Sequence, residues 1–201
     1  MACSVGMEYP VTGVVRLSRR GQNPRKNIGN AGTRKRTESN FLRAFERAYF
    51  ARASAAGVAA GEFSLAGFGI ADLVWIGWDR DSQSGEFTAL SLEKKLNRRH
   101  VFAFEGKIKD WRRALQQAFR YRYFADKGIV VMPHAGSAAA LKNLDAFRHA
   151  CVGFWTFDTV SGVIREHYTP TRIRAFNAEA RSKAIRMLTS KVNFGQLGKQ
   201  P

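Results

Sequence analysis

Three charged residues stand in segments that otherwise have the composition of buried strands. Asp72 interrupts GIADLVW, and Glu105 and Lys107 follow the apolar run VFAF. A buried carboxylate is costly unless it is paired or binds a cation, and side chains two residues apart on a strand share one face. Two such carboxylates could bind Mg²⁺ or Mn²⁺, because a hard cation needs only one or two protein carboxylates besides substrate phosphate. Lys107 could then orient an attacking water or offset charge that develops on the phosphate.

Each of these residues also has an ordinary structural explanation. Asp72 could be a turn or strand-edge acid, and Glu105 with Lys107 could form a local ion pair at a strand end. Gln117, a fourth polar position, could lie on a solvated helix flank rather than beside the carboxylates. Their succession, strand with Asp, strand with Glu and Lys, then a helix with Gln, favours a shared site. The chain has no GxSxG motif, P-loop or paired CxxC that would indicate another chemistry.

The charge of the chain predicts a polyanionic partner. With 33 basic and 16 acidic residues, the net charge is +17, an excess that attracts nucleic acid through counterion release. A generic basic surface or a contact with an anionic membrane face are the alternatives. Arginines interleaved with aromatic residues after position 110 could grip phosphates and stack bases, or could form a solvated basic face beside a core stripe. The candidate nucleic-acid-binding residues are Lys95, Arg98, Arg99, Arg112, Arg113, Arg120 and Tyr121.

Strands that alternate with helices of about a dozen residues predict an α/β fold, with a sheet covered by helices on both faces. Residues 1–36 read as a basic, partly flexible arm and residues 37–201 as one domain. Thr37 can cap a helix that ends before Gly57, and Asp110 can cap a second one. A turn at DSQSG (81–85) can form a hairpin. The expected strands are 68–79, 86–92, 101–108, 128–133, 151–158 and 163–170, and the expected helices after Asp110 are 111–125, 139–150 and 177–190.

These motifs resemble the PD-(D/E)xK nuclease superfamily, in the E-x-K form followed by a Q-x-x-x-Y helix as in RecB-type and Holliday-junction-resolvase-type nucleases. The resemblance covers roughly residues 37–133, with Ala71 in place of the family's proline. It implies a restriction-endonuclease-like central mixed β-sheet, with Asp72 and Glu105 as metal ligands and Lys107 acting on the attacking water. Gln117 and Tyr121 would support the site or the DNA backbone. Glu38 is our choice as the first-helix acid and third metal ligand, with Glu46 as the other candidate.

The resulting expectation is a Mg²⁺- or Mn²⁺-dependent DNA endonuclease that acts in repair, recombination or defence. Its alternative is a non-catalytic nucleic-acid-binding protein with a nuclease-like fold. DNA is the expected partner, with RNA left open, and many members of the superfamily act as dimers, so a homodimer is allowed. The chain lacks a long apolar span and a signal-peptide pattern, so we expect a soluble, cytoplasmic protein without membrane contact. Cys3 and Cys151 are expected to be a free thiol and a core thiol.

Overall fold

A computed structural model describes residues 14–17, 30–52, 56–78, 93–94, 96–171 and 174–190 of the chain. Seven strands form one sheet in which spatial order follows chain order. The strands are β1 (Val14–Leu17), β2 (Ala56–Leu65), β3 (Gly69–Trp78), β4 (Val101–Gly106), β5 (Lys127–Pro133), β6 (Gly153–Phe157) and β7 (Ile164–Tyr168). The helices are α1 (Asn30–Arg52), α3 (Trp111–Tyr121), the 3₁₀ turn η2 (His134–Gly136), α4 (Ala138–Leu141), α5 (Leu144–Ala150) and α6 (Ala178–Thr189).

The sheet is mixed, as expected. Strands β2, β3 and β4 pair in antiparallel fashion, whereas β4, β5 and β6 are parallel to one another. At the two edges, β1 pairs in parallel with β2 and β7 pairs antiparallel to β6. The carboxyl ends of β4, β5 and β6 therefore lie along one edge of the sheet, which is where polar groups from three different strands can gather.

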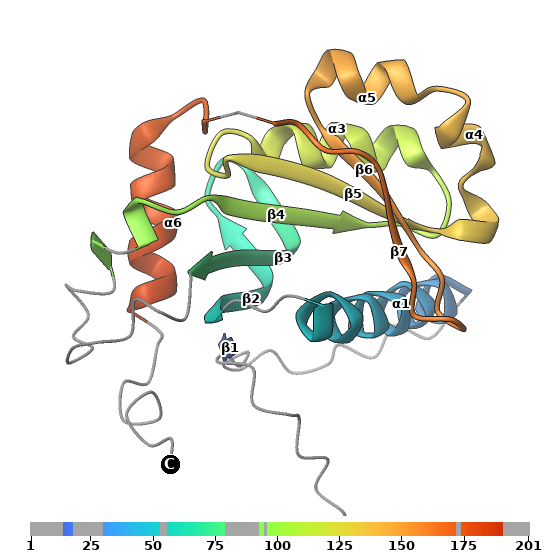
Figure 1. Cartoon of the computed structure of the whole chain (residues 1–201), viewed down its shortest axis with the longest axis horizontal. Helices are drawn as coiled ribbons and strands as arrows, with labels where there is room; N and C mark the ends of the chain where they lie inside the picture. The colour runs from blue at the N-terminus through green and yellow to red at the C-terminus, as the bar shows by residue number, and fades with distance from the viewer. Residues whose placement is uncertain are drawn as a thin grey trace, which may run out of the picture.

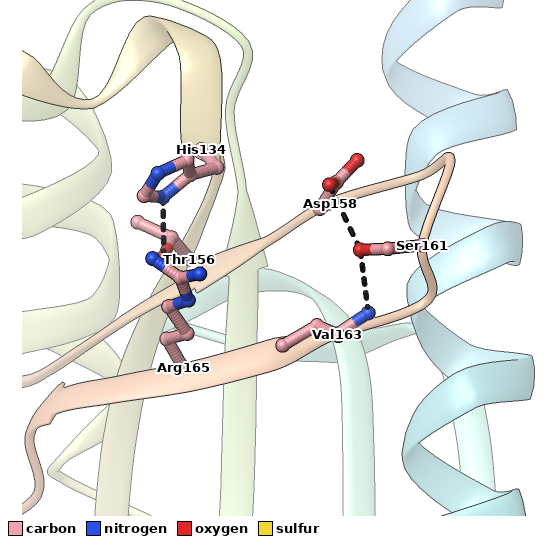
Figure 2. Close-up of a pocket in the computed structure, with 6 residues that line it drawn as sticks. All are labelled: His134, Thr156, Asp158, Ser161, Val163 and Arg165. Atoms are coloured by element: carbon pink, nitrogen blue, oxygen red, sulfur yellow. Dashed lines mark hydrogen bonds between the residues drawn. The ribbon is translucent and has the colours of Figure 1, made fainter.

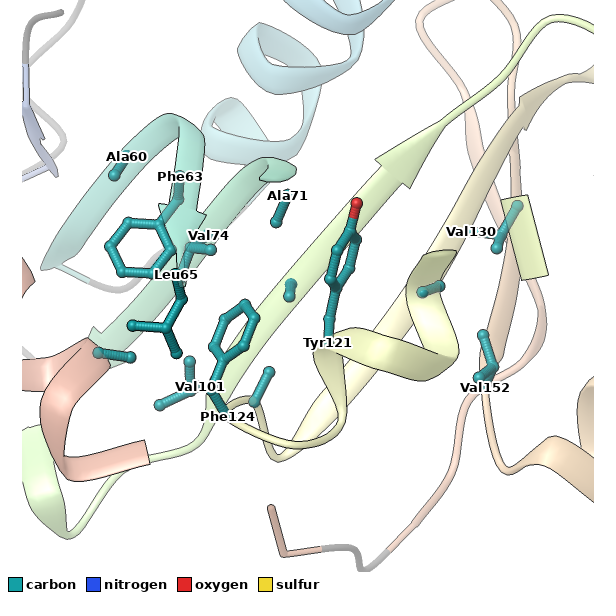
Figure 3. Close-up of a cluster of buried hydrophobic side chains, with 14 of the residues drawn as sticks. Ala60, Phe63, Leu65, Ala71, Val74, Val101, Tyr121, Phe124, Val130 and Val152 are labelled. Carbon is teal, nitrogen blue, oxygen red and sulfur yellow. The ribbon is translucent and has the colours of Figure 1, made fainter. Parts of the chain in front are cut away.

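Helices cover both faces, which confirms the predicted layering (Figure 1). On one face α1 packs Phe41 and Phe45 against aromatic residues of the strands, including Trp75, Phe104 and Phe157. On the other face, α3, α5 and α6 close a larger apolar cluster. Figure 3 shows Tyr121 and Phe124 reaching into this second cluster from the end of α3. Burying one such aromatic side chain stabilises the fold by roughly 1.5–3 kcal/mol, so both faces contribute to the core.

The first helix and the first long strand differ from the expectation. Helix α1 begins at Asn30 rather than after Thr37, so it takes in the end of the segment predicted as an arm. Strand β2 includes GVAAGEF (57–63), a segment for which no strand was expected. Gly57 in this strand is required by packing and does not mark a turn, because a Cβ at this position would overlap the indole of Trp75 on the neighbouring strand.

The other predicted elements after Asp110 are present, with one division. Asp110 caps α3 as expected, since its Oδ1 accepts from the backbone N–H of Arg113 at 3.2 Å. The helix expected over 139–150 is broken at Lys142 and Asn143 into α4 and α5. The predicted turn at 81–85, the predicted strand 86–92 and Cys3 lie outside the described residues. Among the helices that the structure describes, none has the length and apolar character needed to cross a membrane.

Candidate active site

The E-G-K sequence at the end of β4 places its residues on two faces of the sheet. Glu105 is buried, with 1% of its surface exposed, on the side of α3. Gly106 faces α1, where a Cβ would overlap the side chain of Leu42, so only glycine allows the helix to approach this closely. Lys107 extends the strand by donating its backbone N–H to the carbonyl of Val131 at 3.1 Å. The predicted i, i+2 relation holds, since Lys107 Nζ lies 3.0 Å from Glu105 Oε1.

Asp72 joins this group from the neighbouring strand β3. Its Oδ2 accepts a hydrogen bond from the backbone N–H of Gly106 at 2.9 Å. The β2–β3 ladder skips at this position: its partners pass from Gly61–Leu73 to Phe63–Ala71, and Glu62 takes a left-handed backbone with φ of 47°. This irregularity sits where the Asp72 side chain turns toward β4. The backbone amide of Gly106, the residue after Glu105, therefore holds Asp72 close to Glu105, as predicted for these two carboxylates.

Helix α1 supplies the third carboxylate. Glu38 Oε2 lies 3.8 Å from Lys107 Nζ, which places the ammonium group between Glu38 and Glu105. The position of Leu42 explains why Glu38 reaches Lys107. Leu42 packs over Gly106, and Glu38 lies one turn before Leu42 on the same helix face. Glu46 lies one turn after Leu42, in the direction away from Glu38. Of the two first-helix acids considered from the sequence, Glu38 is thus the one at the lysine.

Tyr121 and Gln117 approach from α3. The Tyr121 hydroxyl lies 2.5 Å from Glu105 Oε2 and 2.6 Å from the carbonyl oxygen of Ile70, and in Figure 3 the side chain stands up from α3 beside β4. Tyr121 is only 1% exposed, so its hydroxyl contacts Glu105 inside the fold. A contact between Tyr121 and nucleic acid at the surface, which had been predicted from the sequence, is not compatible with this burial. Gln117 lies one turn earlier on α3, and its buried Oε1 has no hydrogen-bond partner among the residues that the structure describes.

The electrostatics of the group show a shortage of positive charge. Burial, and secondly the charge of Glu105, raise the pKa of Asp72 from 3.8 to about 7. Burial also raises the pKa of Glu105, although the Tyr121 hydrogen bond and Lys107 act in the opposite direction. Burial alone would lower the pKa of Lys107, but the neighbouring carboxylates, Glu105 first, raise it overall. Lys107 is therefore a cation at neutral pH, while the two strand carboxylates are undercompensated.

A hard cation would relieve this shortage. Asp72 Oδ1 makes no hydrogen bond to any residue that the structure describes, and carboxylate oxygens are the ligands that Mg²⁺ and Mn²⁺ prefer. Within the described ranges, however, no three His, Cys, Asp or Glu side chains form a ready-made metal site. The predicted set Asp72, Glu105 and Glu38 is thus adjacent but not arranged as a closed cage. The residues fit an ion that takes two carboxylates and completes its shell with water and substrate oxygens.

The predicted nucleic-acid-binding arginines fall into two groups. Arg112, Arg113 and Arg120 are exposed on α3, which begins four residues after Lys107, and Arg112 lies over the Trp111 ring at 4.6 Å. Arg98 and Arg99 instead precede Val101 at the opposite end of β4, and the strand separates Val101 from Glu105 by about 13 Å at roughly 3.3 Å per residue. This is not the end of β4 at which Asp72, Glu105 and Lys107 meet. Lys95 lies outside the described residues.

A second polar cluster lies further along the same sheet edge (Figure 2). The hydroxyl of Thr156 on β6 is 2.8 Å from His167 Nε2 and 3.5 Å from His134 Nδ1. Burial lowers the pKa of His167, and a small depression above it is also lined by Asp158 and Arg165. The sequence offered no signal for this cluster, because its histidines are 33 residues apart in the chain (167 minus 134) and share no motif.

No protein-family model matches the chain, and no curated protein or solved structure is similar to it at a significant level. The nuclease resemblance therefore depends on the residues and the geometry described above.

Proposed function

We propose that this chain is a metal-dependent nuclease, a DNA endonuclease of the restriction-endonuclease-like class acting in the cytoplasm in repair, recombination or defence. One observation carries the proposal: Asp72, Glu105 and Lys107, from two strands that pair only in the folded chain, meet at one end of β4. Glu105 is buried and Asp72 is half-buried, and neighbouring carboxylates in such surroundings are costly unless they are fully paired or bind a cation. The positive field of a chain with net charge +17 would attract the polyanion that the carboxylates alone would repel.

Each residue has a role that follows from its contacts. Asp72 and Glu105 would hold Mg²⁺ or Mn²⁺, which, when bound, supplies Lewis-acid activation of water and of the phosphodiester. Lys107, a cation held at 3.0 Å from Glu105 Oε1, would donate hydrogen bonds to the attacking water or to the phosphate oxygens. Tyr121 fixes the Glu105 carboxylate through Oε2. Gln117 Oε1, buried and unpaired, is free to accept a hydrogen bond from a water in the site.

The test is cleavage of supercoiled plasmid and of a labelled branched oligonucleotide, with Mg²⁺, Mn²⁺ or EDTA. We expect metal-dependent products from the native chain and a loss of at least about 10²-fold in Glu105→Gln. Glu179→Gln, at an exposed position in the first turn of α6, is the matched control and should cleave at the native rate. Products formed equally by Glu105→Gln would contradict the assignment.

Metal binding can be measured separately from cleavage. A thermal melt with Mn²⁺ at about ten times its dissociation constant should stabilise the native chain by about 1.4 kcal/mol. This gain should be absent in Asp72→Asn and in Glu105→Gln, since each lacks one of the two ligands. An equal gain in all three proteins would place the metal elsewhere.

The rival proposal is a nucleic-acid-binding protein that does not cut. The observation that favours this rival is the pairing of the Lys107 ammonium with Glu105 and Glu38. In this reading the three charges stabilise the fold and have no catalytic role. This reading predicts DNA retardation without products, identical in the native chain and in Glu105→Gln. It also predicts no Mn²⁺-dependent stabilisation.

A further inference from the structure

Four aromatic rings form a continuous surface that runs from the segment before α6 to the β2–β3 turn, where it ends four residues before Asp72. Phe68 stacks on Tyr123 at 5.3 Å and 22°, Tyr123 meets Phe176 edge-on at 5.6 Å, and Phe176 meets Phe119 at 5.9 Å. We call these four residues the aromatic platform. Three of them are unusually open for aromatic side chains, with 38% of Phe119, 40% of Tyr123 and 51% of Phe176 exposed. They come from the β2–β3 turn, from α3 with the turn that follows it, and from the segment before α6.

One buried arginine supports the platform, and one exposed arginine lies near it in the sequence. The guanidinium of Arg122, itself 6% exposed, lies under the Phe176 ring at 4.1 Å and donates to the Ala150 carbonyl at 2.9 Å. Arg120 is exposed between Phe119 and Tyr123 in the sequence. With Phe119, it also borders a groove along α3. A contiguous exposed apolar surface marks an interaction site, and flat rings with neighbouring arginines suit a ligand that has both π-faces and phosphates.

The same turn that carries Phe68 also reaches the active site. Gly69 lies against the Tyr121 ring, with a φ of 92° that brings the chain round the ring. Ile70, 55% exposed, places its carbonyl on the Tyr121 hydroxyl that binds Glu105. From Phe68 to Asp72 the chain spans at most about 13 Å, at roughly 3.3 Å per residue. A strand with duplex-like stacking covers that distance in about four nucleotides at 3.4 Å each, and an extended single strand needs fewer.

We propose that the aromatic platform stacks unpaired bases of a single DNA strand and leads that strand to the carboxylates at the end of β4. Paired bases in a duplex keep their faces covered by their neighbours, so the platform discriminates in favour of single-stranded or splayed DNA. The role of the carboxylates rests on the proposed function, whereas the stacking does not. A protein partner or a second copy of this chain would use the same rings through apolar packing alone, without a preference between forms of DNA.

Binding measured by fluorescence anisotropy in EDTA, at one fixed salt concentration, tests the platform without cleavage. The probes are a short labelled single strand of mixed sequence and the duplex of that sequence. We expect Tyr123→Ala and Phe119→Ala each to weaken single-strand binding roughly tenfold, as loss of one stacked base would, and duplex binding less than twofold. Tyr123→Phe keeps the ring and should bind normally, as should Val160→Ala, an exposed apolar control on the β6–β7 turn. Circular dichroism should show all four variants folded.

Other results of the same measurements would overturn the platform or separate it from the nuclease proposal. Equal losses of affinity for the single strand and for the duplex would show that the rings only support a basic surface that binds both forms of DNA. No loss of affinity for either probe would show that the rings are not part of the DNA-binding site. Unchanged DNA binding, with Phe119→Ala altering the oligomeric state in sedimentation, would assign the rings to contact with a second copy. If the native chain cleaves nothing but shows the single-strand effect, the platform stands and the nuclease proposal fails. If the native chain cleaves DNA but the ring variants show no specific loss of single-strand binding, the nuclease proposal stands and the platform fails.

Discussion

The two ends of β4 each bury a carboxylate, yet they treat it in opposite ways. At the start of the strand, Asp126 is 3% exposed and receives donors on both oxygens. The backbone N–H of Val101 donates to it at 2.8 Å, that of Ala175 at 3.3 Å, and the Arg181 guanidinium lies within 3.1 Å. At the end of the strand, Glu105 has one ammonium group and one hydroxyl, and it faces a second carboxylate, Asp72, across Gly106.

The difference is one of charge compensation: Asp126 is matched by an arginine, whereas Glu105 and Asp72 are only partly compensated. Asp126 ties the start of β4 to α6 through Arg181. Asp72 and Glu105 share one lysine with Glu38, and burial raises the pKa of both strand carboxylates. Perturbed carboxylates next to a cation are typical of functional sites. The following substitutions test whether the two ends of β4 really differ in this way.

The largest change in stability is expected at the start of β4. Asp126→Asn removes the charge that pairs with the largely buried Arg181, so the free energy of unfolding should fall by about 3 kcal/mol. Urea denaturation measures this fall. Asp145→Asn is the control, because Asp145 forms an exposed i, i+3 pair with Arg148 and should change stability by less than about 0.5 kcal/mol. Similar losses in both variants would mean that Asp126 has no special structural role.

At the other end of β4, removing a charge should stabilise the protein. Because the pKa of Asp72 is raised from 3.8 to about 7, the native state binds more protons than the unfolded state between those values. Stability due to this group is therefore present at low pH and lost as pH rises toward 7. Asp72→Asn keeps an acceptor for the Gly106 amide and removes the charge. It should be more stable than the native chain by on the order of 2 kcal/mol at pH 8, after allowance for solvent screening.

The control for Asp72→Asn is the pH dependence itself. The two proteins should have nearly equal free energies of unfolding at pH 4, and urea titrations at both pH values measure the difference. A variant that is less stable than the native chain at pH 8 would show that Asp72, like Asp126, is fully compensated. The contrast between the two ends of β4 would then be lost.

The smallest effect is expected at Tyr121. Tyr121→Phe keeps the buried ring but removes the hydroxyl between Glu105 and Ile70, which should cost about 1 kcal/mol and reduce cleavage because Glu105 is no longer fixed. A double-mutant cycle with Glu105→Gln measures the coupling. The two losses should not add, since Tyr121→Phe removes the donor of this hydrogen bond and Glu105→Gln removes the charge on its acceptor. Additive losses would show that Tyr121 serves only the core.

Local features of the sequence were sufficient for much of the architecture. Alternation predicted β3 and β4, Asp110 predicted the start of α3, and the i, i+2 spacing of Glu105 and Lys107 predicted their shared face. Strand β2 was missed because its glycines indicate a turn by local rules, whereas Gly57 is required by the Trp75 ring lying over it. The start of α1 was also missed, because Thr37 is a good cap in isolation but lies inside the helix.

The sequence by itself determined which residues could do chemistry: two strand carboxylates, a lysine and a basic chain around them. Only the tertiary structure decided how they meet. Pairing of β3 with β4 set Asp72 on the Gly106 amide, and packing of Leu42 on Gly106 selected Glu38 over Glu46. The fold also placed Arg98 and Arg99 at the other end of β4, buried Tyr121 against Glu105 and exposed three rings of the aromatic platform. The physical reason is range: side-chain alternation and helix caps depend on neighbours in the chain, whereas a site depends on contacts between residues that are distant along it.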